Sequence, residues 1–292
     1  MASASEVVLG ATSTQQAHTL AQKAIDEVRR IETKYSRYRP DSVVSRINAA
    51  AGTGWNECDE ETLSLLAFAD TLYRNSGGLF DITSGLLRRA WDFKQGLVPT
   101  PEALQELCGL IGWQHLERDG TRVRLTREGM EIDFGGFGKE YAADRAAALL
   151  MQSGVHCGYV NLAGDMRVMG PKPDGAPWLI GIQDPRRRSG IIATIPLDDG
   201  ALATSGDYER YFEHDGQRYC HILDPRTGQP VTYWRSVSVI APLAVVAGGC
   251  ATAAMLLQSD GGAFLTESGY AFLAINQRSE IFQHAGVQPG TP

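Results

Sequence analysis

A glycine-rich segment at residues 133–139 (DFGGFGK) stands between a β-rich run and a helical run. The backbone N–H groups of such a turn, with the dipole of the helix that it opens, can bind a phosphate. The segment lacks the spacing of a Walker loop, and Tyr141 stands where a dinucleotide fingerprint has its third glycine. Taken alone, the segment leaves a phosphate site and an ordinary tight turn equally open.

His221 is a second candidate for chemistry, because it precedes a turn at 224–228 and follows a hydroxyl-bearing segment at 203–208. An imidazole that titrates near neutrality beside hydroxyl groups could act as a general base. A structural hydrogen bond is the simpler role for a lone histidine. The segment 78–85 could likewise be a loop that joins two helices and carries a capping aspartate.

The elements that position these residues follow from hydrophobic periodicity. Helices are expected over residues 13–38, 59–76, 101–111, 139–153 and 243–258. Strands are expected over residues 123–125, 130–133, 158–164, 178–183, 191–197, 236–241 and 270–275. Helices that cluster early and strands that come later predict an α+β fold rather than a doubly wound parallel sheet.

Composition limits the possible function classes. The chain has 292 residues, a net charge of −7 and 43% hydrophobic residues, so it can bury a sizeable core and lacks the cationic footprint of a nucleic-acid binder. Residues 236–259 carry no charge, but Pro242 and a Gly-Gly pair favour a strand, a turn and a buried helix over a membrane span. Residues 1–10 show no secretory signal, which favours the cytoplasm, or the periplasm if a leader was removed.

Seven segments, taken together and in order, resemble the ApbE family of FAD:protein FMN transferases. They are residues 35–48, 78–87, 132–144, 159–170, 203–212, 221–231 and 236–257, which extend along nearly the whole chain. The resemblance implies a single α+β domain over residues 1–292, with two related halves, mixed or antiparallel sheets and flanking helices. It also implies that FMN is moved from FAD to a Ser or Thr of a partner flavoprotein in a membrane or periplasmic redox system, with release of AMP. Mg²⁺ on the pyrophosphate is implied as well, and the oligomeric state is left open.

The resemblance assigns site residues position by position. It implies that the flavin nucleotide contacts Leu9, Tyr38, Leu79, Phe80, Asp81, Asp133, Gly135, Tyr141 and Ile222. His221, with Ser205 nearby, is implied to assist the acceptor hydroxyl. The metal is implied to bind the backbone carbonyl of Gly138 and the hydroxyl of Thr252.

The chain departs from the family pattern on the expected helix 243–258, where Gly248 and Ala251 stand at the usual and optional metal-binding Asp positions. Mg²⁺ normally requires one or two carboxylates, so a carbonyl and a hydroxyl alone should bind it poorly. Asp260, expected two turns farther along the same helix, is no obvious substitute. Either a distant carboxylate such as Asp165, or the substrate itself, completes the site, or the chain is a non-catalytic FAD-binding protein that acts as a flavin carrier or assembly partner. Hydrolysis of FAD to FMN and AMP is a more remote alternative.

Overall fold

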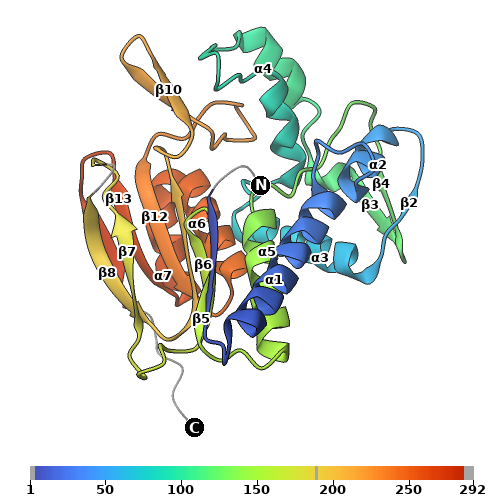
Figure 1. Ribbon diagram of the computed structural model, residues 1–292. Coiled ribbons are helices and arrows are strands. Elements are labelled where there is room, and N and C mark those ends of the chain that lie inside the picture. The colour runs from blue at the N-terminus through green and yellow to red at the C-terminus, as the bar shows by residue number, and fades with distance from the viewer. Residues whose placement is uncertain (1–3, 188–189, 286–292) are drawn as a thin grey trace.

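A seven-stranded antiparallel sheet forms the centre of the computed structural model, which describes residues 4–187 and 190–285 (Figure 1). Its order is β1 (Ser5–Leu9), β5 (Gly158–Leu162), β6 (Asp165–Met169), β9 (Asp199–Gly206), β12 (Trp234–Ala241), β13 (Ala271–Asn276) and β14 (Ile281–His284). Each neighbouring pair in this sheet is antiparallel. The α+β fold class is confirmed.

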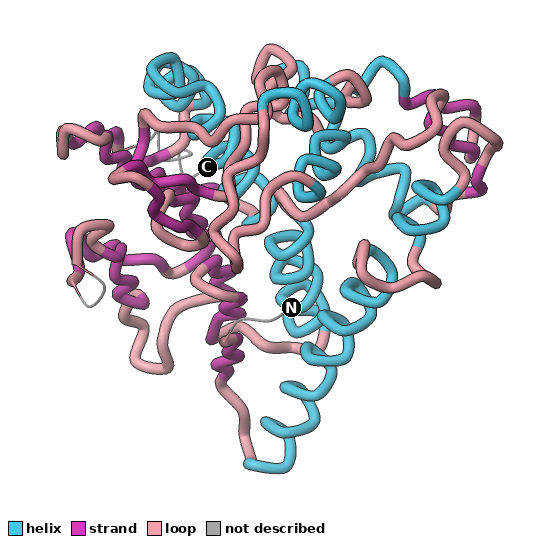
Figure 2. The backbone as a smooth tube through the Cα atoms, turned by 90° about the horizontal axis from the view of Figure 1, so that it is seen from above, coloured by secondary structure: helices cyan, strands magenta, loops and turns pink. Residues whose placement is uncertain are grey.

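Helices cover one face of this sheet. α5 (Gly138–Gln152) packs on β5 and β6, and α6 (Ala244–Leu257) packs on β9 and β12. α1 (Thr14–Tyr35) lies on the outer side of α5, and α3 (Glu60–Asn75) contacts α6. Viewed from above, most of the strands lie on one side of the molecule, and a smaller group of strands lies at the opposite end among helices (Figure 2). The Ala- and Gly-rich sequence of α6 permits this close packing, because eleven of its residues are buried.

The opposite face of the sheet is covered by a hairpin of β7 (Trp178–Gln183) and β8 (Ile191–Leu197). Side chains alternate along a strand, so Met166 and Val168 of β6 join the small core under this hairpin. Asp165 and Arg167 of the same strand therefore face the helices. This alternation carries Asp165 to the interface between the sheet, α5 and α6.

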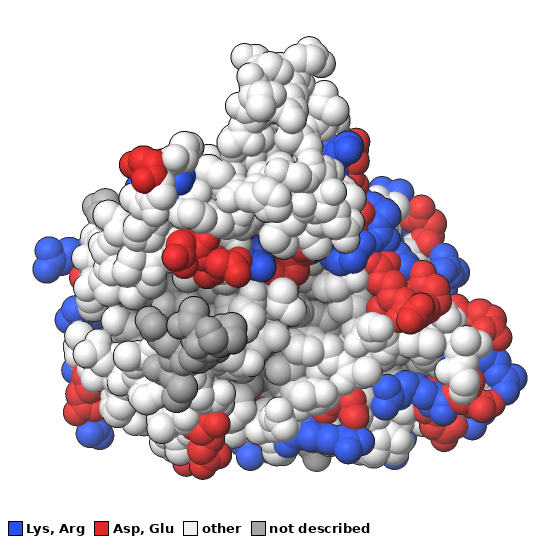
Figure 3. Space-filling view, turned by 90° about the horizontal axis from the view of Figure 1, so that it is seen from below, with Lys and Arg blue, Asp and Glu red and all other residues white. Residues whose placement is uncertain are grey.

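The remaining elements surround this framework. They are α2 (Val43–Ala49), β2 (Asn56–Glu57), η1 (Ile82–Arg89), α4 (Pro101–Cys108), η2 (Trp113–His115), β3 (Leu116–Asp119), β4 (Arg122–Leu125), β10 (Tyr211–His214), β11 (Gln217–Cys220), η3 (Gln258–Asp260) and α7 (Gly261–Ser268). β2, β4 and β3 form a small sheet, and β10 pairs with β11. On the face shown in Figure 3, basic and acidic side chains are interspersed.

Most of the expected elements are confirmed, with two corrections. The strand expected at 130–133 is absent, because the Asn48 side chain forms the hydrogen bonds that a partner strand would form. The Ile132 N–H donates to Asn48 Oδ1 at 2.7 Å, and Asn48 Nδ2 donates to the Ile132 carbonyl at 3.0 Å. Asp260 does not lie on the helix of residues 244–257, since α6 ends at Leu257 and η3 follows. The uncharged stretch 236–259 is a strand followed by a buried helix, and no helix among the described residues is long and apolar enough to cross a membrane.

Candidate functional site

Two buried phenylalanines hold the glycine-rich turn in place. Phe134 and Phe137 pack against each other with ring centroids 5.4 Å apart, and Phe80 stacks on Phe137 at 6.2 Å. A Cβ on Gly136 would lie 2.9 Å from the Phe80 ring, so glycine is required for this approach. The Gly135 N–H donates to the Asp133 side chain at 2.9 Å. The turn is therefore rigid and leads directly into α5.

The first turn of α5 has no side-chain cap. Phe137 is the N-cap residue and supplies no side-chain hydrogen bond to the first-turn N–H groups, although the Gly138 N–H donates to the Phe134 carbonyl at 2.6 Å. These groups carry the positive end of the helix dipole, which favours an anion. Lys139, in the same turn, adds a positive charge and forms an ion pair with Asp165. This helix start suits a phosphate or pyrophosphate.

Two carboxyl groups meet behind Lys139. Asp165, which opens β6 and is 2% exposed, accepts a hydrogen bond from the Thr204 N–H at 3.0 Å. Glu140 lies beside it and is 7% exposed. Burial, together with the charge of Asp165, raises the pKa of Glu140 well above its usual value. Glu140 Oε2 is buried without a hydrogen-bond partner.

Helix α6 brings two hydroxyl groups and a glycine to the same interface. Ser205 Oγ of β9 lies 2.8 Å from Thr252 Oγ1 of α6. Gly248 precedes Thr252 by one helical turn and so lies on the same face of α6. A Cβ on Gly248 would lie only 2.7 Å from Cγ and 2.8 Å from Oε1 of Glu140. The Glu140 side chain thus fills the space that a side chain at position 248 would need.

His221 follows β11 and lies close enough to Arg210 and Lys139 for their charges to act on it. Its backbone N–H donates to the Arg210 carbonyl at 3.0 Å. Burial, with the nearby Arg210 and Lys139 charges, lowers the pKa of His221 to about 4. Nδ1 is buried without a hydrogen-bond partner. The imidazole is therefore neutral at pH 7.

Tyr38 is an exposed member of the predicted nucleotide contacts, with 77% of its surface accessible. The Arg37 guanidinium lies 4.9 Å from the centre of its ring and forms an ion pair with Asp133. Partial burial acts to raise the pKa of Tyr38, but the Arg37 hydrogen bond and the charges of Arg210 and Arg88 outweigh it and lower the pKa. Tyr38 therefore lies among basic side chains, one of which, Arg37, links it to Asp133 of the glycine-rich turn.

The triplet Leu79, Phe80 and Asp81 is buried beneath that turn. Asp81 Oδ1 accepts hydrogen bonds from the N–H and hydroxyl of Thr83 at 2.8 and 2.7 Å, and Oδ2 accepts one from the Trp113 N–H at 3.0 Å. Both carboxylate oxygens are thus engaged within the protein. Asp81 acts as the N-cap of η1 and positions the segment.

Two of the predicted nucleotide contacts lie apart from this cluster. Tyr141 points toward α3, where its hydroxyl donates to Glu61 at 2.8 Å. Leu9 pairs with Gly158 at one end of β5, whereas Asp165 pairs with Leu162 at the other end. Because β5 rises about 3.3 Å per residue, these ends are about 13 Å apart.

Ile222 remains with the cluster through its neighbour His221. It is buried, and its carbonyl accepts a hydrogen bond from the Val231 N–H at 3.0 Å.

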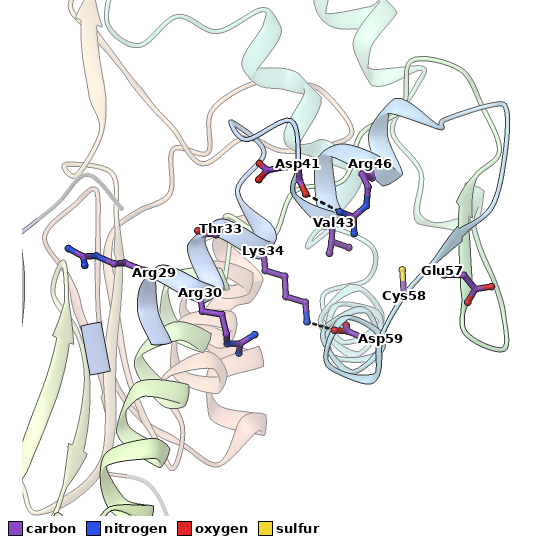
Figure 4. Close-up of a pocket in the computed structure, with 10 residues that line it drawn as sticks. All are labelled: Arg29, Arg30, Thr33, Lys34, Asp41, Val43, Arg46, Glu57, Cys58 and Asp59. Atoms are coloured by element: carbon purple, nitrogen blue, oxygen red, sulfur yellow. Dashed lines mark hydrogen bonds and ion pairs between the residues drawn. The ribbon is translucent and has the colours of Figure 1, made fainter. Parts of the chain in front are cut away.

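A separate pocket of about 630 Å³ opens between α1, α2 and residues 57–59 (Figure 4). The Lys34 side chain reaches across it to Asp59, and Arg46 donates to the backbone carbonyl of Asp41 at 2.9 Å. None of the side chains predicted to bind FAD or metal lines this pocket. Its wide opening and internally paired charges make it a weaker candidate than the interface of α5, α6 and the sheet.

The donor set at the interface fits a hard divalent cation. Glu140 and Asp165 provide carboxylates, Ser205 and Thr252 provide hydroxyls, and Glu140 Oε2 has no other partner. Mg²⁺ is usually held by one or two carboxylates together with substrate phosphates and water. Within residues 4–187 and 190–285 there is no group of three or more His, Cys, Asp or Glu that could hold a metal. The described residues thus supply only two carboxylates at this interface, and Mg²⁺ bound there would need further ligands from substrate phosphates or water.

Sequence reasoning missed Glu140, Lys139 and Arg210 as site residues. A signal for Glu140 was present, because it shares a helix face with Ala143, Asp144 and Ala147, all of them buried. A carboxylate on the apolar face of a helix needs a partner. Arg210 is brought in by its contact with His221, which no local pattern indicates.

Comparisons with known proteins identify the family of the chain. The family model of the ApbE family matches residues 1–274. The FAD:protein FMN transferase of Vibrio cholerae is 33% identical over 245 residues, which cover 82% of this chain and 73% of that protein. The crystal structure of the ApbE protein from Thermotoga maritima has a TM-score of 0.88 at 35% identity, covering 96% and 93% of the two chains. The flavin transferase ApbE from Vibrio cholerae has a TM-score of 0.84 at 28% identity, covering 97% of each chain.

Proposed function

The chain belongs to the ApbE family, and on that premise we propose that it is an FAD:protein FMN transferase. FAD is the donor, and the acceptor is a Ser or Thr hydroxyl of a partner flavoprotein. The observation that carries the proposal is the convergence of a helix N-terminus without a side-chain cap, a carboxylate pair and a neutral histidine at one interface.

The reaction is a phosphoryl transfer. The acceptor oxygen attacks the phosphorus on the FMN side of the pyrophosphate, a new phosphoester bond forms, and the P–O bond to AMP breaks. The hydroxyl proton must leave the acceptor, and AMP departs with the bridging oxygen. The chain therefore has to bind the pyrophosphate, orient the hydroxyl and accept one proton.

Residues of this chain fit each of these tasks. The first turn of α5 and Lys139 bind the pyrophosphate through N–H groups and positive charge. His221, neutral at pH 7, accepts the proton from the acceptor hydroxyl. Glu140 and Asp165 would hold Mg²⁺, which when bound neutralises the charge that develops on the phosphate oxygens. Tyr38, exposed at the mouth of the site, offers an aromatic surface to the nucleotide.

Incubation of the protein with FAD, Mg²⁺ and a flavoprotein acceptor tests the proposal. The acceptor should gain the mass of one FMN on a single Ser or Thr, and AMP should appear in equal amount. An acceptor with that residue replaced by Ala is the control and should gain no mass. Binding of FAD without transfer would favour the flavin-carrier alternative, and AMP released without acceptor would favour hydrolysis.

The partner and the compartment are finer parts of the same proposal. The acceptor would belong to a membrane or periplasmic redox system, as the family resemblance implies. The cytoplasm or the periplasm remains a prediction for the enzyme itself.

A further inference from the structure

The missing carboxylate at position 248 has a structural counterpart on the neighbouring helix. Gly248 of α6 faces Glu140 of α5, and a Cβ at 248 would stand 2.7–2.9 Å from Cγ, Oε1 and Cδ of Glu140. Real Cβ atoms do not approach other atoms that closely, so a side chain at 248 would fit only if the Glu140 side chain moved away. The glutamate therefore delivers an oxygen atom to the volume that a carboxylate at 248 would occupy.

One carboxylate oxygen of Glu140, Oε2, has no hydrogen-bond partner, unlike the oxygens of a nearby buried carboxylate with a structural role. Asp144 offers a direct comparison, because it lies one turn farther along the same face of α5 and is also buried. Its two oxygens accept hydrogen bonds from the N–H groups of Ala244 and Val245, both at 2.8 Å, and so cap α6. Glu140 Oε2 has no partner, and the neighbouring carboxylate of Asp165 is itself engaged by Lys139 and the Thr204 N–H.

Two adjacent buried carboxylates repel each other unless positive charge offsets them, and the single Lys139 ammonium cannot offset both. The Ser205 and Thr252 hydroxyls lie on the strand and helix that border the same space. Glu140, Asp165, Ser205 and Thr252 all offer oxygen atoms, which Mg²⁺ and Mn²⁺ prefer. The surroundings of Glu140 thus have the composition of a divalent-cation site.

We propose that Glu140 supplies, from α5, the metal-ligating carboxylate that α6 lacks at Gly248, and that Glu140 and Asp165 together bind a divalent cation of the Mg²⁺ class. This inference rests on the proposed function, because the cation would serve the FAD pyrophosphate. It concerns binding of the metal, however, and binding is measurable without any transfer reaction.

Titration of the full-length protein with Mn²⁺, followed by the EPR signal of free Mn²⁺, measures this directly. Wild type should bind one Mn²⁺. Glu140→Gln, which keeps the size of the side chain, should bind at least about tenfold more weakly, since even changes in residues that only orient ligands cost ~10–100-fold. The exchange variant Glu140→Gly, Gly248→Asp should regain binding, because it returns one carboxylate to the shared space. Asp144→Asn, the matched control, should keep wild-type affinity in its folded fraction.

Three outcomes would overturn the inference. They are no Mn²⁺ binding by wild type, unchanged affinity in folded Glu140→Gln, and failure of a folded exchange variant to regain binding. Circular dichroism and melting curves on each variant establish that it is folded. Failure of the proposed function looks different, since Mn²⁺ would bind as expected while wild type transferred no FMN in the presence of Mg²⁺.

Discussion

Replacement of Asp81 by Ala should destabilise the fold itself, even in the absence of FAD. The carboxylate accepts three hydrogen bonds, and its loss leaves the buried N–H groups of Thr83 and Trp113 without partners. Each orphaned buried donor costs about 1–3 kcal/mol, so we expect a loss of about 2–5 kcal/mol. In a protein of this size that corresponds to a fall in melting temperature of roughly 5–15 °C. Thermal and urea unfolding of the FAD-free protein measure it.

A graded series makes this prediction specific. Asp81→Asn keeps one acceptor oxygen but turns an amide toward a backbone donor, so its effect should be intermediate. Asp41→Ala is the control, because Asp41 is exposed and its side chain pairs with Arg39 alone, and it should change stability by less than about 0.5 kcal/mol. An unchanged melting temperature in Asp81→Ala, together with weaker FAD binding, would refute the structural role and make Asp81 a direct nucleotide contact.

Three further predictions concern charge and packing. An NMR titration of the His221 ring should show a midpoint near pH 4, and a midpoint at 6.5 would contradict the burial argument. Because this pKa lies below the usual 6.5, the neutral imidazole contributes to the stability of the folded protein above pH 6.5, and this contribution is lost as the pH falls toward 4. Glu61→Gln should destabilise the protein at pH 7, because the hydrogen bond from Arg30 holds the pKa of Glu61 below its usual value despite partial burial. In urea unfolding, the difference in free energy of unfolding between the variant and wild type should shrink as the pH falls below 4.5, and a difference that stays constant would argue against this role of Glu61. Gly248→Ala should cost about 1–3 kcal/mol by crowding Glu140, yet be neutral or stabilising in a Glu140→Gly background, as double-mutant unfolding measurements would show.

The sequence predicted most elements because long amphipathic or strongly alternating segments leave few choices. The helices at 14–35 and 244–257 and the strands at 178–183 and 234–241 lie close to their expected limits. The error at 130–133 has a definite cause. Met130 and Ile132 alternate with polar residues as in a strand, but Asn48, 84 residues away, supplies the hydrogen bonds that a strand would need from a neighbour. The hydrophobic periodicity of a segment carries no information about a hydrogen-bond partner so far away in the sequence.

The site was predicted from the resemblance more than from local sequence pattern, and the errors of that prediction follow from its source. Resemblance placed the glycine turn and His221 near each other, and the structure brings both to the start of α5. Both carboxylate oxygens of Asp81, which the resemblance places against the nucleotide, are engaged within the protein, and the resemblance gave no sign of this. Tyr141 and Leu9 lie elsewhere because helix rotation and strand direction decide where a side chain points.

The change at position 248 cannot be interpreted from α6 alone. As a helix-interior residue, glycine costs about 1 kcal/mol relative to alanine, which by itself would make Gly248 replaceable. The structure reverses that expectation, because Glu140 already occupies the space, and an Asp at 248 would collide with it. Glycine at 248 and glutamate at 140 are therefore sterically linked. Introducing Asp at 248 without removing Glu140 should damage packing, whereas the exchange of both residues should be tolerated.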